Sequence, residues 1–542
     1  MRAAQAVGLV LARLGAGPVF GVVGSGNFEF TNALRDNGVE FYATRHEMGA
    51  ATAADAFARM SGRVTIVSTH QGCGLTNSVT GLGEAAKSRT PMLVLTADTP
   101  DGDALSNFRI DQDALVRSVG AVSIRVGSAE DAVADAVRAY RTALHERRTV
   151  VLHLPLDVQA EEVAGPDGLP EIGPAPVIEP ADHEVDGLAE LIAGAKRPVF
   201  VAGRGARAAG GEIAALAEKC GALLATSAVA NGLFHDSPWS LGISGGFAAP
   251  LTAELITGAD LIVGWGCALN RWTTKQGKLI GPDARLAQVD VERAALGAHR
   301  PVTLGVLGDA ALTATAVAGR LAGRELTGYR SAELEKRIAA EGRWSLVVPE
   351  DTSTDSRIDP RTLSAELDRI LPAERVIGVD SGNFMGYPSA YLSVPDENGF
   401  CFTQAFQSIG LGLATALGAA LAQPDRLPVA ALGDGGFHMA LAELETAVRL
   451  RLPLVIVVYN DAAYGAEVHH FAGDHTTVRF PDTDAAAIGR GFGATGITVR
   501  RVADLEEVRT WLAGPRAAPL VIDAKLTDDG GSWWLAEAFH SH

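Results

Sequence analysis

Short runs of β-branched and apolar residues alternate with alanine-rich amphipathic stretches along the whole 542-residue chain. This alternation is typical of βαβ units, in which crossover helices join parallel strands. At roughly 150 residues per domain, a chain of this length is expected to form three to four domains. Hydrophobic residues make up 47% of the sequence and charged residues 20%, which excludes disorder or a coiled coil as a description of the whole. We therefore predict an α/β protein with doubly wound parallel sheets.

The alternation restarts twice, so the strand candidates fall into three groups. The first group comprises residues 19–23, 39–44, 64–68, 92–96 and 149–154, the second 197–202, 223–226, 261–263 and 287–291, and the third 376–379, 428–432, 454–459 and 520–523. Aperiodic stretches at 155–184 and 349–359 separate the groups and are interpreted as linkers. We predict three domains of this kind at residues 1–165, 186–335 and 355–530, followed by a tail at 531–542.

The charge balance excludes some classes of partner. Asp and Glu number 64 against 46 Lys and Arg, so the formal net charge is −18, and such a surface repels nucleic acid and anionic lipid. No apolar run reaches the ~18 residues of a membrane helix. The four cysteines, Cys73, Cys220, Cys267 and Cys401, lie far apart and are interpreted as reduced thiols of a cytoplasmic protein. We expect a small-molecule substrate, with no nucleic acid and no membrane.

The most informative segment is Gly433-Asp434-Gly435-Gly436, which ends one predicted strand and opens a helix. The next predicted strand ends at Asn460-Asp461-Ala462-Ala463-Tyr464-Gly465. Because both strand ends lie on the carboxyl edge of a parallel sheet, Asp434 and Asp461 are expected to converge beside a helix N-terminus. Two carboxylates and glycine amides are what a Mg²⁺–diphosphate needs, with the Ala463 carbonyl as a further ligand. An isolated GDGG would be only a turn, but the strand–helix–strand register favours the metal site.

The block from Gly433 to Gly465 resembles the diphosphate-binding motif of thiamine-diphosphate-dependent enzymes, the superfamily of pyruvate decarboxylase, benzoylformate decarboxylase and acetolactate synthase. The resemblance implies thiamine diphosphate and Mg²⁺ as cofactors. One departure is that the family usually has Asn where this chain has Asp461. The register favours Asp461 as the metal ligand, and Asn460 stays as the alternative.

The segment Arg45-His46-Glu47-Met48-Gly49-Ala50-Ala51 follows a predicted strand and precedes an alanine-rich helix. It resembles the activating-glutamate segment of the same family. The resemblance implies that the Glu47 carboxyl hydrogen-bonds the pyrimidine ring of the cofactor and favours the tautomer that removes the thiazolium C2 proton. Without the resemblance, a glutamate flanking a helix start would be the commoner interpretation.

A third segment, Thr69-His70-Gln71-Gly72-Cys73-Gly74-Leu75-Thr76-Asn77, resembles the family's Gly-Pro-Gly loop ending in Asn, with Cys73 in place of Pro. The resemblance implies catalytic roles for four further residues: His70, Gln71, Ser25 and Glu467. Each has a structural alternative, such as a hydrogen-bonded core histidine or a solvated helix face. The adjacent His469 and His470 are expected at the rim of the site and not on one metal ion.

The resemblance also supplies the rest of the cofactor cradle. Ile409 would be the apolar wedge that holds the cofactor in its bent conformation, although it could equally be ordinary core. The remaining cofactor neighbours that the resemblance implies are Gly72, Asn77, Gly382, Asn383, Phe384, Phe437, Tyr464 and Gly465. In the middle third, Gly203-Arg204-Gly205 is a weak dinucleotide motif, and we expect no bound flavin. The tail, with Trp533 and Trp534, is expected either to fold over the active site as a lid or to dock on a neighbouring subunit.

Taken over the whole chain, the resemblance implies a decarboxylase or carboligase acting on a 2-keto acid. Loss of CO₂ would leave an enamine, which is either protonated or added to a second carbonyl. Because Glu47 and Asp434 lie in different domains, the resemblance implies a homodimer or homotetramer with active sites at the subunit interface. The alternatives are a relative of 2-hydroxyacyl-CoA lyase or oxalyl-CoA decarboxylase, or a non-catalytic subunit that only binds the cofactor.

Overall fold

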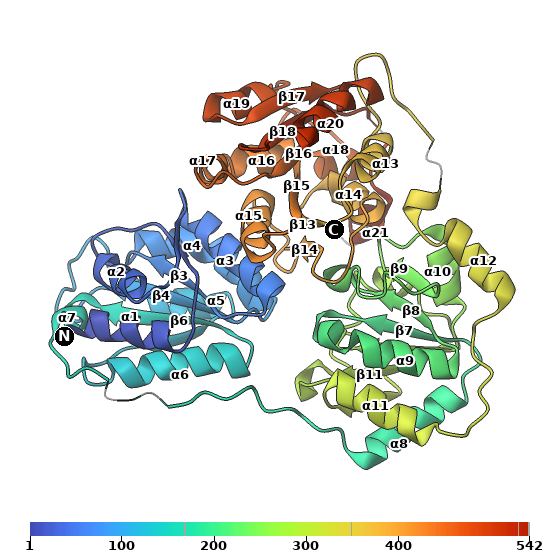
Figure 1. Ribbon diagram of the computed structural model, residues 1–542, viewed down its shortest axis with the longest axis horizontal. Coiled ribbons are helices and arrows are strands. Elements are labelled where there is room, and N and C mark those ends of the chain that lie inside the picture. Colours follow the sequence, from blue (N-terminus) through green and yellow to red (C-terminus); the bar gives the residue numbers. More distant parts are fainter. Residues whose placement is uncertain (167, 169, 348–349, 529, 540–542) are drawn as a thin grey trace.

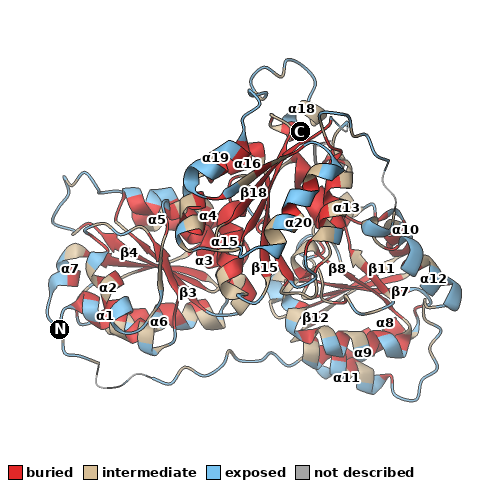
Figure 2. Cartoon of the chain, turned by 45° about the horizontal axis from the view of Figure 1, so that its top comes forward, coloured by how far each residue is buried: buried red, intermediate tan, exposed pale blue. Residues whose placement is uncertain are grey.

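Three parallel sheets organise the molecule. The computed structural model describes residues 1–539 apart from 167, 169, 348, 349 and 529. Each sheet has six strands, and every pairing between named strands is parallel. Helices cover both faces of each sheet, and the strands form the most deeply buried layer (Figure 2). The prediction of an α/β fold with doubly wound parallel sheets is confirmed.

The first sheet has the strand order β2-β1-β3-β4-β6-β5. Its core is aliphatic, with Val19, Ile66, Leu93 and Val150 all fully buried. Its strands are β1 (Val19–Gly21), β2 (Phe41–Ala43), β3 (Thr65–Thr69), β4 (Met92–Asp98), β5 (Val122–Arg125) and β6 (Thr149–Pro155). Its helices are α1 (Ala3–Arg13), α2 (Phe28–Asp36), α3 (Glu47–Ser61), α4 (Cys73–Lys87), α5 (Gln112–Ser118), α6 (Ala132–His145) and α7 (Leu156–Ala160).

The last sheet repeats this topology, with the order β14-β13-β15-β16-β18-β17. Its strands are β13 (Arg375–Val379), β14 (Phe400–Phe402), β15 (Leu427–Gly433), β16 (Val455–Asn460), β17 (Thr495–Val499) and β18 (Leu520–Lys525). Its helices are α13 (Pro360–Ile370), α14 (Gly386–Tyr391), α15 (Gly412–Ala422), α16 (Asp434–Met439), α17 (Ala442–Arg449), α18 (Gly465–His470), α19 (Ala485–Phe492), α20 (Glu506–Ala513) and the tail helix α21 (Trp533–Phe539). The helix predicted after the GDGG segment, at residues 440–450, corresponds to α17, and α16 is an additional short helix within and after the segment.

The central sheet has a different order, β12-β11-β10-β7-β8-β9, which is the order of many dinucleotide-binding sheets. Its strands are β7 (Pro198–Ala202), β8 (Leu223–Thr226), β9 (Ser240–Ile243), β10 (Leu261–Trp265), β11 (Arg285–Asp290) and β12 (Leu304–Leu307). Its helices are α8 (Asp182–Ala193), α9 (Gly210–Cys220), α10 (Pro250–Thr257), α11 (Ala310–Arg320) and α12 (Ala332–Glu341).

The three lobes do not follow one another in space as they do in sequence. Figure 1 shows the first lobe against the last one through α3 and α15, with the central lobe on the other side of the last. Small residues permit the α3–α15 contact, since a Cβ on Gly418 would lie 2.0 Å from the Ala53 carbonyl oxygen. The first lobe is therefore attached to the last by direct packing.

The C-terminal tail is docked between lobes. Trp534 is 2% exposed and packs against Phe247 of the central lobe and Tyr387 of the last lobe. A Cβ on Gly386 would meet the Trp534 ring at 2.2 Å. The described part of the tail therefore packs within its own chain, which is neither of the two expected arrangements, a lid or docking on a neighbouring subunit. Residues 540–542 of the predicted tail lie outside the described part. None of the described helices is long and apolar enough to cross a membrane.

Candidate active site

The first half of the site lies at the carboxyl edge of the last sheet. Strands β13, β15 and β16 are neighbours, and their ends carry residues 380–384, 433–436 and 461–465. The strand order reverses between β13 and β15, which is where open α/β sheets bind ligands. Helix α16 begins at Asp434, six residues before the predicted helix start, so its first N–H groups face the same edge.

Asp434 and Asp461 bring their carboxyl groups within hydrogen-bonding reach of each other. Burial raises the pKa of both groups, and the charge of Asp434 raises the pKa of Asp461 further. Two buried carboxyl groups in contact repel each other when ionised, so this arrangement favours a cation between them. The Ala463 backbone lies beside them and forms an isolated antiparallel β-bridge with the backbone of Arg479.

The side chain of the neighbouring Asn460 makes structural hydrogen bonds and does not face Asp434. Its side-chain nitrogen donates to Asp523 Oδ1 at 2.8 Å and to the Thr483 carbonyl, and its oxygen accepts the Ala462 N–H. Asn460 thereby fixes the backbone of the loop, which leaves Asp461 as the side chain that faces Asp434. This geometry favours Asp461 over Asn460 as a metal ligand.

Asp380 organises the glycine-rich loops, a role that the sequence did not reveal. It is fully buried, and its carboxylate accepts the N–H groups of Gly410 at 3.0 Å and Leu411 at 3.2 Å. A Cβ on Gly436 would lie 2.0 Å from Asp380 Oδ2, so glycine is required there. Burial raises the pKa of Asp380 to about 6, against the opposing effect of these N–H donors. The only sequence signal was an acidic residue directly after a buried strand.

The described residues fit a diphosphate-bearing cofactor with a metal ion. Asn383 is 8% exposed, its side-chain oxygen is buried without a hydrogen-bond partner among the described residues, and its Cβ would lie 3.1 Å from a Cβ on Gly465. Such a group is costly to leave unpaired and indicates a missing ligand. No group of three or more His, Cys, Asp or Glu side chains able to hold a metal occurs among the described residues. A cation there would need oxygen ligands from the backbone and from the cofactor itself.

The second half of the site lies at the carboxyl edge of the first sheet. Glu47 opens helix α3 directly after β2 and is 8% exposed. Asn77, on α4, donates its side-chain N–H to Glu47 Oε2 at 3.0 Å. The hydrogen bond from a neutral amide orients one carboxylate oxygen and leaves the other for a ligand.

His70 and Ser25 meet across the first sheet's own reversal point, between β1 and β3. Ser25 Oγ lies 3.3 Å from His70 Nε2, and His70 Nδ1 lies 3.0 Å from the Gln71 carbonyl oxygen. Because a carbonyl only accepts, Nδ1 carries the proton, and in the neutral ring Nε2 accepts from the serine hydroxyl. Gln71 is 3% exposed, and its side-chain oxygen has no partner among the described residues.

Gly72 shows why the glycine of this loop is needed. Its φ is +62°, and a Cβ would lie 2.4 Å from the Phe108 carbonyl oxygen. Its N–H donates to Gln112 Oε1 at 2.7 Å, which holds the loop against α5. Cys73, in place of the family's proline, is an exposed free thiol, whereas the other three cysteines are buried and free.

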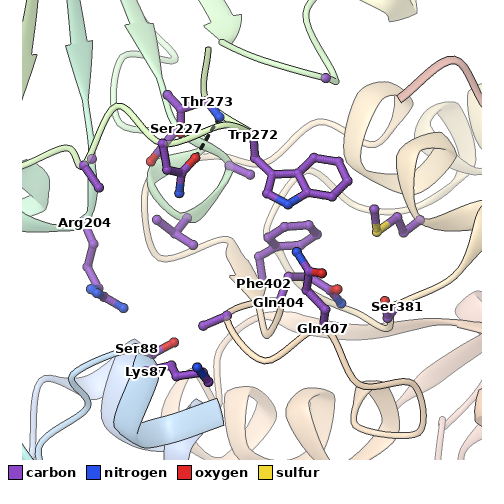
Figure 3. Close-up of a pocket in the computed structure, with 18 of the residues that line it drawn as sticks. Lys87, Ser88, Arg204, Ser227, Trp272, Thr273, Ser381, Phe402, Gln404 and Gln407 are labelled. Atoms are coloured by element: carbon purple, nitrogen blue, oxygen red, sulfur yellow. Dashed lines mark hydrogen bonds between the residues drawn. The ribbon is translucent and has the colours of Figure 1, made fainter. Parts of the chain in front are cut away.

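A cavity of about 1890 Å³ connects the last sheet to the central lobe. Figure 3 shows it between Gln404, Phe402 and Ser381 of the last lobe, Trp272 and Arg204 of the central lobe, and Lys87 of the first. The predicted site residues that line it are Gly382, Asn383, Phe384, Ile409, Gly433, Asp434, Gly435, Gly436, Asp461, Ala463, Tyr464, Gly465 and Glu467.

Within one chain the two halves of the site stay apart. The described lining of this cavity does not include Glu47, His70, Ser25, Gln71 or Asn77. Nor does it include Phe437, whose ring is fully buried in the core behind α16. His469 and His470 contact the tail instead, through Asp528 and Ser532 respectively, so they do not form a metal pair.

The glycine motif of the central lobe is used for packing. A Cβ on Gly203 would lie 2.3 Å from the Gly266 carbonyl oxygen, and one on Gly205 would lie 2.9 Å from Gly266 Cα. Gly266 itself has a φ of +50°. These glycines let the loops after β7 and β10 touch each other. Arg204, between them, lines the cavity, and burial lowers its pKa to about 10.

Fold and site together define a class of multidomain α/β enzymes. The edge of the last sheet fits an anionic cofactor, and the edge of the first sheet carries the Glu47 carboxylate paired with the Asn77 amide. Three family models match the chain: the N-terminal binding domain of thiamine pyrophosphate enzymes at residues 1–115, their central domain at 185–317 and their C-terminal binding domain at 380–524. The chain belongs to the thiamine-diphosphate-dependent enzyme superfamily.

Curated relatives cover nearly the full length. The chain is 30% identical to a probable 2-ketoarginine decarboxylase AruI of Pseudomonas aeruginosa, over 94% of this chain and 90% of that protein. It is 28% identical to a sulfoacetaldehyde acetyltransferase of Castellaniella defragrans, over 95% and 89% of the two chains. It is 27% identical to a probable acetolactate synthase large subunit of Methanocaldococcus jannaschii, over 86% and 81%. These relatives include decarboxylase, synthase and transferase activities.

Proposed function

We propose that the chain is a thiamine-diphosphate- and Mg²⁺-dependent enzyme that decarboxylates a 2-keto acid. The product carbon is then either protonated, giving an aldehyde, or joined to a second carbonyl, giving an acyloin. The observation that carries the proposal is the pair of facing carboxyl groups, Asp434 and Asp461, at the N-terminus of α16. The unpartnered oxygen of Asn383 beside them supports it.

In this proposal Asp434, Asp461 and the Ala463 carbonyl would hold Mg²⁺, and the α16 N–H groups would bind the diphosphate. When bound, thiamine diphosphate supplies an electron sink for the carbon that loses CO₂. Ile409 would support the cofactor from one wall of the cavity. Phe384, stacked on Tyr459 with ring centroids 5.2 Å apart, would form another.

The remaining roles fall to groups that move or hold protons. Glu47, with one oxygen held by Asn77, would bind the pyrimidine ring. His70, paired with Ser25, would orient the substrate carboxylate or transfer a proton. Glu467 is exposed on α18 at the cavity wall and would serve as a second acid or base.

We further propose that the active enzyme is a homodimer or homotetramer. In one chain Glu47 does not line the cavity that contains Asp434, so one copy would supply Glu47 and another the diphosphate site. We also keep the domain limits 1–165, 186–335 and 355–530, the tail from 531 and a cytoplasmic location as parts of the proposal.

The proposal is tested by supplying purified protein with thiamine diphosphate and Mg²⁺ and following CO₂ release from a panel of 2-keto acids. The panel is run with and without an acceptor aldehyde, which separates protonation from carbon–carbon bond formation. We expect CO₂ release from at least one 2-keto acid of the panel, abolished by EDTA. Cofactor binding without turnover of any acid would instead support the non-catalytic alternative.

One observation favours a second candidate, an enzyme acting on a coenzyme A thioester. The cavity continues from the diphosphate site to cationic side chains of two other lobes, Lys87, Arg204 and Arg271. Arg204 makes no ion pair with any described residue, and Figure 3 shows it directed into the cavity. The same assay with oxalyl-CoA and a 2-hydroxyacyl-CoA distinguishes the candidates, because only this one predicts turnover of thioesters.

A further inference from the structure

The helix that carries Glu47 is held in place by a carboxylate from another lobe. Glu443, on α17, accepts the backbone N–H of His46 at 3.0 Å and of Arg45 at 3.1 Å through Oε1. Its other oxygen accepts the Thr446 hydroxyl at 2.7 Å. Glu443 is 3% exposed. A buried carboxylate therefore binds the two residues that directly precede Glu47.

This contact stabilises the start of α3 from outside. The first N–H groups of a helix have no partner within it, and the helix dipole favours negative charge there. His46 is the N-cap residue, and its Nδ1 accepts the Met48 N–H at 3.1 Å. Glu443 adds the charge that the cap lacks, so it fixes both the position and the direction of the first turn.

The sequence accommodates this approach at Gly49. A Cβ on Gly49 would lie 2.3 Å from Glu443 Oε1 and 2.6 Å from its carboxyl carbon. Gly49 has no positive φ that would require glycine, and glycine in a helix costs about 1 kcal/mol relative to alanine. The absence of a side chain is therefore explained by the contact with Glu443.

Glu443 also lies close in sequence to the half of the site that is proposed to bind the diphosphate. Helices α16, which begins at Asp434, and α17, which carries Glu443, form one continuous segment. The Glu47 side chain is oriented by Asn77 on its own lobe, while its backbone is located by the lobe that holds the metal site. Within one chain, the backbone before Glu47 is thus held by the lobe that carries the Asp434–Asp461 pair, although the two halves of the site lie apart.

We propose that Glu443 is a positioning residue that sets the place of the Glu47 carboxyl for cofactor activation. The inference rests on the proposed role of Glu47. A misplaced general acid or base loses rate without losing the cofactor, because the diphosphate is bound elsewhere. Glu443→Gln should therefore change the chemistry at the cofactor and leave cofactor affinity almost unaltered.

The test measures hydrogen–deuterium exchange at C2 of enzyme-bound thiamine diphosphate by rapid quench and NMR. We expect Glu443→Gln to slow exchange by about tenfold to a hundredfold, since small displacements of a reacting group cost this much. Cofactor affinity, measured by titration, should stay within about threefold, well below the tenfold that corresponds to 1.36 kcal/mol. Glu443→Asp, which keeps the charge, should retain part of the rate.

The matched control is Glu445→Gln, two positions along the same helix. Glu445 pairs with the Arg45 guanidinium at 2.7 Å, but this ion pair is partly exposed and does not contact the backbone before Glu47. Exposed ion pairs contribute little, so this variant should exchange at the wild-type rate. Equal exchange rates for wild type, Glu443→Gln and Glu445→Gln would overturn the inference.

A second variant keeps the test decisive if Glu443→Gln does not fold. Gly49→Ala retains the charge but displaces the carboxylate, so exchange should also slow. An unchanged rate in that variant would count against the inference. The two proposals fail differently: if Glu47→Gln slows exchange and the Glu443 and Gly49 variants do not, only the positioning role is lost. If Glu47→Gln exchanges at the wild-type rate, the proposed role of Glu47 is wrong, and the inference fails with it.

Discussion

The first and last sheets have the same strand order, yet their carboxyl edges carry different arrangements of charge. At the first edge a single carboxylate, Glu47, is paired with the neutral amide of Asn77. At the last edge two carboxyl groups, Asp434 and Asp461, face each other, and burial raises the pKa of both. In our proposal the first edge transfers protons and the last edge binds a cation. The shared topology locates both sites, but side-chain pairing decides what each can do.

The central sheet adds a contrasting case, in which a glycine motif at the carboxyl edge serves packing. Its strand order is the one often used for dinucleotides, but the glycines at its reversal point are packed against each other. A glycine motif at the right edge is therefore insufficient evidence of a ligand. The cationic wall of the cavity, with Arg204, is the stronger observation in this lobe.

The largest effect is expected from Glu47→Gln. An amide cannot exchange a proton with the pyrimidine ring, so turnover should fall by about 10²–10⁴, the usual contribution of a general acid or base. Cofactor affinity should change little. Steady-state assays and cofactor titration measure the two quantities, with Glu40→Gln, an exposed glutamate before β2, as the control. A loss of cofactor affinity as large as the loss of turnover would contradict the proposal that the first edge acts in catalysis and the last edge binds the diphosphate.

A smaller effect, on binding, is expected at the other edge. Asp434→Asn should weaken Mg²⁺-dependent cofactor binding by at least the 10–100-fold that loss of an outer-shell partner costs. Asp461→Asn should weaken it less, because the family usually has Asn at this position and an amide oxygen there can still coordinate a cation. Fluorescence titration at several Mg²⁺ concentrations ranks the two. A reversed order would assign the principal ligand to Asp461.

In the central lobe, a substitution at the glycine motif should lower the stability of the protein without changing its activity. Gly203→Ala places a methyl group against Gly266 and should cost about 1–3 kcal/mol, as overpacking does. Gly211→Ala is the matched control, because nothing lies within 4 Å of its Cβ position, and it should be neutral or stabilising. Thermal melts measure the difference, and activity per folded molecule should be unaffected. A large activity loss in a folded Gly203→Ala protein would indicate that this loop binds a ligand.

The smallest effect is expected from Ser25→Ala. Its hydroxyl makes one hydrogen bond, to His70, in an exposed position, and such a bond contributes about 0.5–1.5 kcal/mol. We expect kcat/KM to fall by less than about tenfold, because tenfold corresponds to 1.36 kcal/mol. If Ser25→Ala were as inactive as Glu47→Gln, serine would have a direct role in the chemistry.

Every central strand was predicted from the sequence, together with one edge strand, β2. Buried parallel strands such as β15 and β16 are almost uninterrupted apolar runs. The strands that were not predicted, β5, β9, β12, β14 and β17, all lie at sheet edges. Edge strands are short or mixed in polarity, so periodicity does not distinguish them from loops.

The site shows the same limit. Motif spacing indicated the Asp434–Asp461 pair because each aspartate directly follows a strand, whereas Glu47 was identified only through the resemblance to the family. Asp380 and Glu443 were missed because their partners are backbone N–H groups distant in sequence, at Gly410 and His46. A single carboxylate contains no signal of such a contact. The empty Cβ positions at Gly436 and Gly49 reveal it only once the fold is known.

One consequence follows from the order of the lobes in space. The described residues among 163–181 contain no helix or strand and run from the first lobe to the central one (Figure 1). In contrast, α3 packs on α15, and Arg59, paired with Asp55 and Glu84, donates to the Phe402 carbonyl. A protease cut in this exposed crossing would sever the backbone but leave that buried contact intact. The two fragments should therefore co-elute on gel filtration, and the protein should tolerate being made as two separate polypeptides.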